Sequence, residues 1–181
     1  MKAIVTGHTK GLGEALASDL LARDIPVLGL ARTFSHEMQA RCPGLLSQIT
    51  IDLGDTAALG HWLAGSALRH YLAGDTAILL INNAGVVQPV GALADQTPAA
   101  IAHAVALNVA APMMLSAAVV AMSPGAERRI LHISSGAGRN AYPGWSVYCA
   151  TKAALDQHAR AVALDAVPGV RICSLAPGVI D

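Results

Sequence analysis

Tyr148 and Lys152 lie four residues apart at the start of an Ala-rich run that continues to Ala166. On a helix this spacing puts both side chains on one face, one turn apart. A cation about 4 Å from a tyrosine hydroxyl, at an effective dielectric of about 20, favours the phenolate by up to ~4 kcal/mol. The pair is therefore a candidate for giving and taking a proton near neutral pH, with a solvated surface pair as the alternative.

A glycine-rich turn follows the first apolar run of the chain. Its glycines have the spacing Gly-x-x-x-Gly-x-Gly. Glycine lets the backbone approach a pyrophosphate closely, and the N–H groups that open the following helix point at it. The turn predicts a dinucleotide site, with an ordinary glycine-rich turn as the alternative. The expected cofactor-binding residues of this turn are Gly7, Thr9, Lys10, Gly11, Leu12 and Gly13.

Two cations favour NADP(H) over NAD(H) as the bound dinucleotide. Arg32 ends the second apolar run, where a dinucleotide fold meets the adenosine ribose. A cation there suits a 2′-phosphate, and Lys10 adds a second positive charge. No Asp or Glu occurs in residues 27–35 to accept from a 2′-hydroxyl instead. Asp52, at the end of the third strand, is a candidate acceptor for the adenine amino group, with capping of the next helix as the alternative.

Strands alternate with helices along the chain, which indicates an α/β class with a parallel sheet. The predicted strands are Lys2–Thr6, Ile25–Ala31, Ser47–Ile51, Ala77–Ile81, Arg129–Ile133 and Val170–Leu175. The predicted helices are Glu14–Arg23, Thr56–Tyr71, Pro98–Met122 and Tyr148–Ala166. The polar and glycine-rich clusters follow the carboxyl ends of strands, where ligands bind in an open α/β sheet.

The composition indicates one compact domain with neither a nucleic-acid nor a membrane partner. The 181 residues are 54% hydrophobic and 13% charged, and their formal net charge is +0. The chain therefore has no excess of positive charge that would attract nucleic acid or an anionic membrane. The apolar run Ala110–Met122 is too short to span a bilayer. Three cysteines without metal-ligand spacing favour a reducing cytoplasmic compartment, and no metal site is expected. Cys149 is expected to be a small buried residue rather than a nucleophile.

The order of motifs resembles the short-chain dehydrogenase/reductase family over the whole chain. The motifs are TGHTKGLG (residues 6–13), Asp52-Leu53, Asn82-Asn83-Ala84-Gly85, Asn108, Ser135, Tyr148-x-x-x-Lys152 and Pro177-Gly178. The resemblance implies a Rossmann-type doubly wound parallel sheet of order 3-2-1-4-5-6, with a seventh strand absent here. It also implies cofactor contacts from Leu53, Asn83, Ala84, Gly85, Pro177 and Gly178. Within the family, GWSVYCATKAA and APGVID are similar to the branch of sepiapterin and benzil reductases.

The resemblance implies a catalytic tetrad of Asn108, Ser135, Tyr148 and Lys152. Ser135 rather than Ser134 stands thirteen residues before the tyrosine. Tyr148 would protonate the developing alkoxide, and Ser135 would hydrogen-bond the same oxygen. Lys152 would hold the nicotinamide ribose and Asn108 would fix a water. The expected function is an NADPH-dependent oxidoreductase for a small carbonyl or alcohol; the alternative is a catalytically silent nucleotide-binding or scaffold protein of the same fold.

The resemblance also implies self-association and a longer natural chain. Family members commonly pair through the two helices that correspond to residues 98–122 and 148–166, and both are poor in charge here, so a homodimer or homotetramer is expected. In the family the chain continues beyond the Pro177-Gly178 turn into a substrate loop and a seventh strand. Residues 1–181 are thus expected to form one nucleotide-binding domain without that region, which leaves Val170–Leu175 as an exposed apolar edge.

Overall fold

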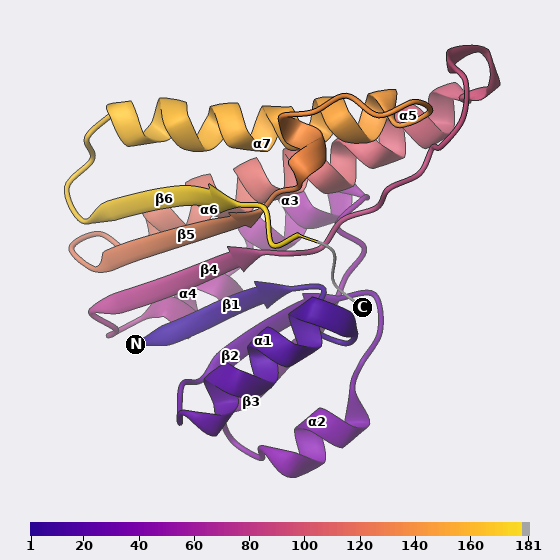
Figure 1. Ribbon diagram of the computed structural model, residues 1–181. Coiled ribbons are helices and arrows are strands. Elements are labelled where there is room, and N and C mark those ends of the chain that lie inside the picture. Colours follow the sequence, from indigo (N-terminus) through magenta and orange to yellow (C-terminus); the bar gives the residue numbers. More distant parts are fainter. Residues whose placement is uncertain (179–181) are drawn as a thin grey trace.

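All six strands pair in one parallel sheet (Figure 1). The computed structural model describes residues 1–178. The strands are β1 (Lys2–Thr6), β2 (Val27–Ala31), β3 (Leu46–Thr50), β4 (Ala77–Asn82), β5 (Glu127–Ile133) and β6 (Val170–Leu175). Their order is β3-β2-β1-β4-β5-β6, so the predicted Rossmann-type order is confirmed. Between β1 and β4 the order of strands reverses direction, and this is the point where such sheets bind ligands.

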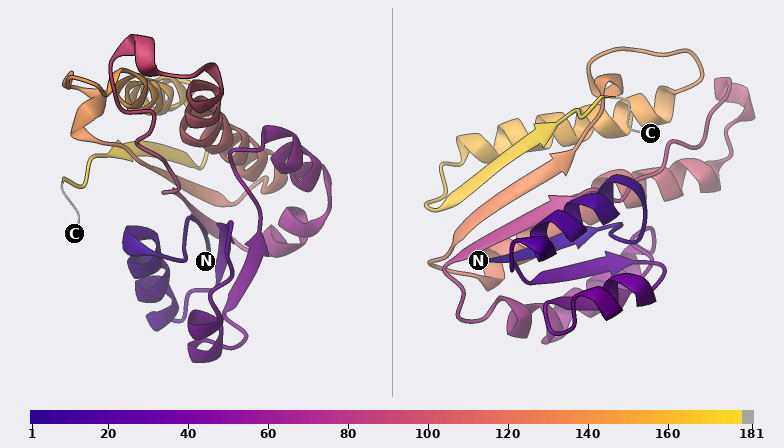
Figure 2. Two further views of the ribbon diagram at one scale, coloured as in Figure 1. Left: turned by 90° about the vertical axis from the view of Figure 1, so that its right-hand side faces the viewer. Right: turned by 60° about the horizontal axis from the view of Figure 1, so that its bottom comes forward.

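Helices lie on both faces of the sheet (Figure 2). One face carries α1 (Gly11–Ala22) and α2 (His36–Arg41); the other carries α3 (Thr56–Ala64), α4 (Ala67–Leu72), α5 (Pro98–Val105), α6 (Ala111–Met122) and α7 (Ser146–Leu164). Short 3-10 helices occupy Leu93–Asp95 and Gly136–Gly138. Two apolar clusters result: Ile4, Leu80 and Leu115 belong to the larger one, and Val5 and Leu20 belong to the one beneath α1.

Helices α5 and α6 are joined without a break by a π-helical turn, Ala106–Ala110. The combined span Pro98–Met122 has a mean hydropathy of 1.9 and is long and apolar enough to cross a membrane. It is therefore longer than the apolar run expected from the sequence. Leu115 and Val119 are nevertheless fully buried within the larger core cluster. Packing in the core accounts for part of the apolar character of this helix, because 33% of its most apolar window is buried.

The edge of the sheet beyond β5 is formed by β6, as expected. Exposed and half-buried residues alternate along this strand, with Arg171, Cys173 and Leu175 exposed. The half-buried Ile172 packs against the larger core cluster. Among the described residues, no helix packs against β6 on the sheet face that carries α1 (Figure 2). Arg171, Cys173 and Leu175 therefore lie on the uncovered face, where Leu175 is 50% exposed beside a charged residue.

The predicted set of helices needs two corrections. The predicted helix Thr56–Tyr71 is split into α3 and α4 because Gly65 ends α3 in an extended conformation, with ψ −175°. Helix α2 was not predicted. It begins after Ser35, whose hydroxyl accepts from the Met38 N–H, and it buries the Met38 side chain. The break at Gly65 and the start of α2 after Ser35 each depend on one or two residues, and apolar periodicity does not resolve boundaries that finely.

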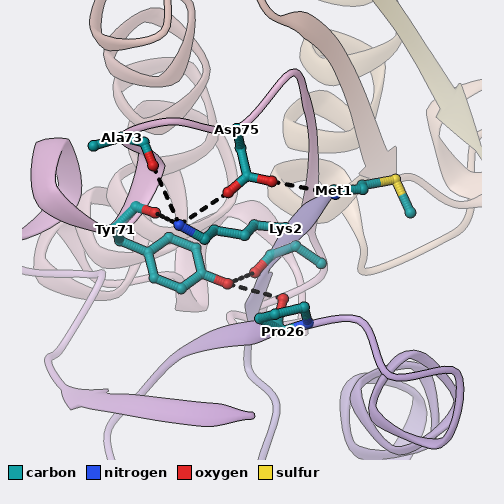
Figure 3. Close-up of polar contacts among 7 residues, drawn as sticks. Met1, Lys2, Pro26, Tyr71, Ala73 and Asp75 are labelled. Atoms are coloured by element: carbon teal, nitrogen blue, oxygen red, sulfur yellow. Dashed lines mark hydrogen bonds and ion pairs between the residues drawn. The ribbon is translucent and has the colours of Figure 1, made fainter. Parts of the chain in front are cut away.

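A polar cluster holds the amino ends of β1 and β2 (Figure 3). The Lys2 ammonium donates to the Tyr71 carbonyl oxygen at 2.7 Å and pairs with Asp75 at 2.9 Å. The Tyr71 hydroxyl lies 2.9 Å from the carbonyl oxygens of both Ala3 and Pro26. Burial, reinforced by the Asp75 charge, raises the pKa of Tyr71, so the hydroxyl remains a donor. The cluster ties α4 to the sheet at the end opposite the ligand-binding edge.

Candidate active site

The carboxyl ends of β1, β2, β3 and β4 surround an open cavity of about 470 Å³. Most of the predicted cofactor-binding residues line it: Gly7, Thr9, Lys10, Gly11, Leu12, Gly13, Arg32, Asp52, Leu53, Asn83, Ala84 and Gly85. The predicted residues outside this lining are Tyr148, Lys152, Pro177 and Gly178. The predicted cofactor-binding residues therefore form one continuous surface, except for those on α7 and in the turn after β6.

The glycine-rich turn fits a pyrophosphate. Gly7 has φ +69°, a conformation that favours glycine. A Cβ at Gly13 would overlap the carbonyl oxygen of Gly7 and the amide of Asn83. The backbone of Gly7 therefore packs directly against Gly13 in the first turn of α1. Lys10 stands at the N-cap position without a side-chain cap, so the first N–H groups of α1 have no capping acceptor and suit an anion.

Thr6 is a supporting residue that the sequence analysis missed. Its hydroxyl oxygen lies 2.9 Å from the backbone nitrogens of both Asn83 and Ala84. The Asn83 side chain in turn donates to the Thr6 carbonyl oxygen at 2.9 Å. These bonds lock the loop after β4 against the glycine turn. The available signal was a lone hydroxyl at the end of β1, directly after three apolar residues.

The end of the cavity that the sequence predicts for the adenosine carries Asp52 and the two predicted cations. Arg32 and Lys10 are exposed and line the cavity. The Asp52 carboxylate accepts from the Gly54 N–H at 2.8 Å. Helix α3 is capped by Asp55, which accepts from Ala57 and Ala58. The helix-capping alternative for Asp52 is therefore wrong, and one carboxylate oxygen of Asp52 remains available beside the cavity.

Asn108 is buried at the centre of the π-helical turn. Its side-chain oxygen accepts from the Val86 N–H at 2.9 Å, and its amide donates to the Val86 carbonyl at 2.8 Å. The same amide group lies 3.1 Å from the Thr151 hydroxyl, next to Lys152. The Asn108 side chain thus joins the loop after β4 to α7. Thr151 completes this connection and was not predicted.

Lys152 is buried, with 5% of its surface exposed. Its ammonium donates to the Ile133 carbonyl oxygen at 2.8 Å and lies 5.6 Å from the centre of the Tyr148 ring. The ammonium therefore lies over the Tyr148 ring. Burial lowers the pKa of Lys152 to about 8, although the Asp156 charge acts in the opposite direction. A Cβ on Gly85 would lie 3.6 Å from the Lys152 nitrogen, so α7 reaches the end of the cavity.

The two serines after β5 have different environments. Ser134 is buried, and its hydroxyl donates to the Lys152 carbonyl oxygen at 3.4 Å. Ser135 is half-buried, and its hydroxyl accepts from the Ala137 N–H at 3.2 Å. The hydrogen atom of the Ser135 hydroxyl is therefore free for another acceptor. This difference favours Ser135 over Ser134 as the residue that meets a substrate.

Aromatic rings gather around Tyr148. The Trp145 ring meets it edge-on with centroids 5.5 Å apart, and the Tyr142 ring lies 5.6 Å from Trp145. A Cβ on Gly136, beside Ser135, would lie 3.9 Å from the Tyr142 hydroxyl. Three of the six Phe, Trp and Tyr residues of the chain thus lie at this site. Cys149 is half-buried rather than buried, which corrects the expectation for it.

Comparison with known proteins assigns this arrangement to a family. The sequence profile described as "short chain dehydrogenase" matches residues 1–181. The chain belongs to the short-chain dehydrogenase/reductase family. Members of this family are NAD(P)-dependent oxidoreductases, which agrees with a dinucleotide cavity next to a tyrosine and a buried lysine.

Curated relatives and solved structures agree with the family assignment. The benzil reductase ((S)-benzoin forming) of Bacillus cereus is 32% identical, over 98% of this chain and 75% of the relative. The sepiapterin reductase of Meriones unguiculatus is 34% identical, over 98% of this chain and 73% of the relative. A crystal structure of a short-chain dehydrogenase/reductase from Burkholderia vietnamiensis superposes with a TM-score of 0.97, at 60% identity, over 99% of this chain and 84% of that chain. The predicted resemblance to the sepiapterin and benzil reductase branch is confirmed.

A second group of polar side chains, from β4, β5 and α7, lies away from the cavity. The His132 ring lies 3.1 Å from the Asn82 amide on one side and 3.1 Å from the His158 ring on the other. Burial, reinforced by the charges of His158 and Lys152, lowers the pKa of His132 to about 4. His132 is therefore neutral at pH 7. Within residues 1–178, no group of three His, Cys, Asp or Glu is arranged for a metal ion.

Proposed function

We propose that this protein is an NADPH-dependent carbonyl reductase that also catalyses the reverse alcohol oxidation. The observation that carries the proposal is the placement of Lys152 and Asn108 at the Gly85 end of the dinucleotide cavity. Tyr148 lies one turn before Lys152 on α7. The proposed catalytic groups therefore meet the site at the end away from Arg32, where a nicotinamide would lie if the adenosine occupies the Arg32 end.

The proposed mechanism assigns one task to each side chain of the tetrad. Bound nicotinamide supplies or accepts the hydride at its C4 carbon. The Tyr148 hydroxyl donates its proton to the carbonyl oxygen of the substrate, and in the oxidation it takes that proton back. Ser135 donates its free hydroxyl hydrogen to the same oxygen. The Lys152 ammonium stabilises the tyrosinate electrostatically, and Asn108 holds the loop after β4 against α7.

The preference for NADPH is supported by charge. Arg32 and Lys10 line the adenosine end of the cavity and are exposed, so both are free to pair with a 2′-phosphate. Asp52, the carboxylate that lines the same end, has one oxygen engaged with the backbone of Gly54. A bidentate arginine–phosphate contact is the stronger of the two cationic contacts.

The proposed substrates carry the carbonyl next to an aromatic or heteroaromatic ring. Two observations support this class: the Tyr142–Trp145–Tyr148 group of rings at the site, and relatives whose names specify benzil and sepiapterin. Aromatic rings stack in offset or edge-on geometry and contribute about 0.5–1.5 kcal/mol per pair beyond burial of area. Planar conjugated ketones therefore suit this site better than small aliphatic ones.

NADPH consumption by the purified protein tests the proposal. Benzil, sepiapterin and diacetyl are offered as substrates, with NADH as the alternative cofactor; diacetyl is the ring-free diketone control. Turnover with benzil or sepiapterin, above that with diacetyl, is the expected result. Tight NADPH binding without turnover on any of the three would instead identify a catalytically silent nucleotide-binding or scaffold protein.

We also propose that the protein is a homodimer or homotetramer through the helix Pro98–Met122 and α7. Val105 in α5 and Leu164 in α7 are exposed, at 44% and 86%. Apolar helix surface of this kind is typical of subunit contacts. Light scattering at micromolar concentration tests the assembly, and a monomer mass would contradict it.

We also propose a reducing, cytoplasmic compartment for this protein, which the three free cysteines support.

A further inference from the structure

A histidine lies beneath the glycine-rich turn and takes no part in the proposed chemistry. His8, between Gly7 and Thr9, has none of its surface exposed. Its Nε2 atom lies 2.8 Å from the Gln48 side-chain oxygen on β3. This contact crosses from the turn that receives the pyrophosphate to the far strand of the sheet, past β2.

The sequence makes room for the His8 ring at one place. A Cβ on Gly29, in the middle of β2, would lie 2.5 Å from three ring atoms of His8. Real Cβ atoms do not approach so closely, so any other residue at position 29 would displace the ring. Gly29 in β2 is thus matched to His8 in the neighbouring turn.

Gln48 is the centre of a hydrogen-bonded group at the loop after β2. Its oxygen accepts from the Ser35 N–H at 2.8 Å, and its amide donates to the Ser35 carbonyl at 3.1 Å and to Gln39 at 3.1 Å. These two bonds to Ser35 fix which end of the Gln48 amide is oxygen. His8 must therefore donate from Nε2.

A donating Nε2 occurs in both the neutral and the charged ring, and burial favours the neutral form. A neutral imidazole with its proton on Nε2 leaves Nδ1 as an acceptor, and Nδ1 has no hydrogen-bond partner among the described residues. Burial lowers the pKa of His8, against the smaller opposing effects of the Gln48 bond and of the Leu30 backbone. A buried polar atom without a partner is costly, so an apolar residue would fill this position at lower cost if packing were its only task.

A second bond connects the same two loops. The Thr9 and Thr33 hydroxyl oxygens are 3.0 Å apart. The glycine-rich turn is thus connected to residues 32–35 directly through Thr9 and Thr33, and indirectly through His8, Gln48 and Ser35. Arg32 lies directly before Thr33, between the end of β2 and these two connections, and lines the cavity.

We propose that His8 and Gln48 are positioning residues that hold the Arg32 loop against the glycine-rich turn, and so set the preference for a 2′-phosphorylated adenosine. The inference rests on the proposed NADPH preference and concerns residues that do not line the cavity. An arginine on a fixed loop loses less conformational entropy when it binds a phosphate, so its contact contributes more to affinity. Adenosine without the 2′-phosphate does not use this contact.

The test is calorimetric binding of 2′,5′-ADP and 5′-AMP, which differ in the 2′-phosphate, together with the melting temperature. Gln48→Met keeps the shape and removes the hydrogen bonds. We expect about a tenfold weaker affinity for 2′,5′-ADP, about 1.4 kcal/mol, with the affinity for 5′-AMP changed less than about threefold. Gln39→Met is the matched control, because Gln39 belongs to the same group but does not contact His8; both ligands should bind it as they bind the wild type.

Equal weakening of both ligands by Gln48→Met, or no weakening, would overturn the inference, since a merely structural role does not distinguish them. His8→Phe keeps a ring over Gly29 and removes the donor, so it should give the same selective loss and serves where Gln48→Met does not fold. If the wild type binds 2′,5′-ADP no better than 5′-AMP, the proposed NADPH preference fails, and this inference fails with it.

Discussion

Replacing Lys152 by methionine should stabilise the protein while it abolishes turnover. Burial lowers the pKa of Lys152 from 10.5 to about 8, so keeping the ammonium charged at pH 7 costs about 3 kcal/mol of folding free energy. Methionine removes this cost and has a similar length and helix propensity. It also loses the hydrogen bond to the Ile133 carbonyl oxygen, worth ~1 kcal/mol. The net expectation is a gain of about 2 kcal/mol, or a melting temperature roughly 4–8 °C higher.

The pH dependence gives the sharper test. Below pH 8 both the folded and the unfolded wild type carry the Lys152 charge, so the full cost is present. Between pH 8 and 10.5 the folded protein has released this proton while the unfolded chain still binds it, so the cost diminishes as pH rises. The stability advantage of Lys152→Met should therefore be greatest at pH 7 and should reverse by about pH 10.5 to a deficit of about 1 kcal/mol, which is the lost hydrogen bond.

Urea unfolding at pH 7 and pH 9.5 measures both quantities, with Lys10→Met as the control. Lys10 is exposed, so its replacement should give no such pH-dependent difference. A Lys152→Met protein that is less stable than the wild type at pH 7, or an advantage that is constant with pH, would show that the buried lysine is not held at a cost. NADPH oxidation by the variant should be undetectable.

Other substitutions test the site and the fold separately. Tyr148→Phe should lower turnover by a factor of at least ~10² with NADPH affinity retained; turnover within a few-fold of wild type would refute the assignment. Arg32→Asp should weaken NADPH binding at least ~10-fold and affect NADH little, and equal losses would count against a 2′-phosphate contact. Tyr71→Phe removes the hydroxyl that holds Ala3 and Pro26, so it should cost ~1–3 kcal/mol in urea unfolding with unchanged cofactor affinity; a weakened affinity would contradict the separation of the two ends of the sheet.

Most of the sheet could be predicted because its strands are apolar and end at glycine or polar residues. Ala77–Ile81 is a continuous apolar run of this kind, and β4 is one residue longer than predicted. The break between α3 and α4 could not be predicted in the same way. Leu59 and Leu68 both contribute to one core cluster, so the apolar pattern continues across the break at Gly65. Where tertiary packing of two short helices imitates one long helix, sequence periodicity alone does not separate them.

The cavity lining was predicted better than the contacts behind it. The glycine-rich turn, Asp52 and Arg32 were recognised because glycine and charge are conspicuous in an apolar sequence. Thr6 and Gln48 were missed because their partners are backbone groups distant in sequence. The position of the Lys152 ammonium over the Tyr148 ring depends on where β5 places the Ile133 carbonyl oxygen. The spacing of four residues predicts that Tyr148 and Lys152 share one helix face. It does not predict that the Ile133 carbonyl oxygen binds the ammonium.

The π-helical turn between α5 and α6 widens the helix around Asn108. A π turn holds one residue more than the α-helical turn it replaces, and here that residue falls within Ala106–Ala110, around Asn108. Five residues in a π turn rotate the chain about as far as four residues in an α-helix, so deleting one alanine would restore a regular helix and leave α5 and α6 in nearly the same relative rotation. Leu115 and Val119 would keep their places in the core. Asn108 would lose the widened turn from which its side chain bonds to Val86. A single-residue deletion in this turn should therefore spare the fold and disturb the site.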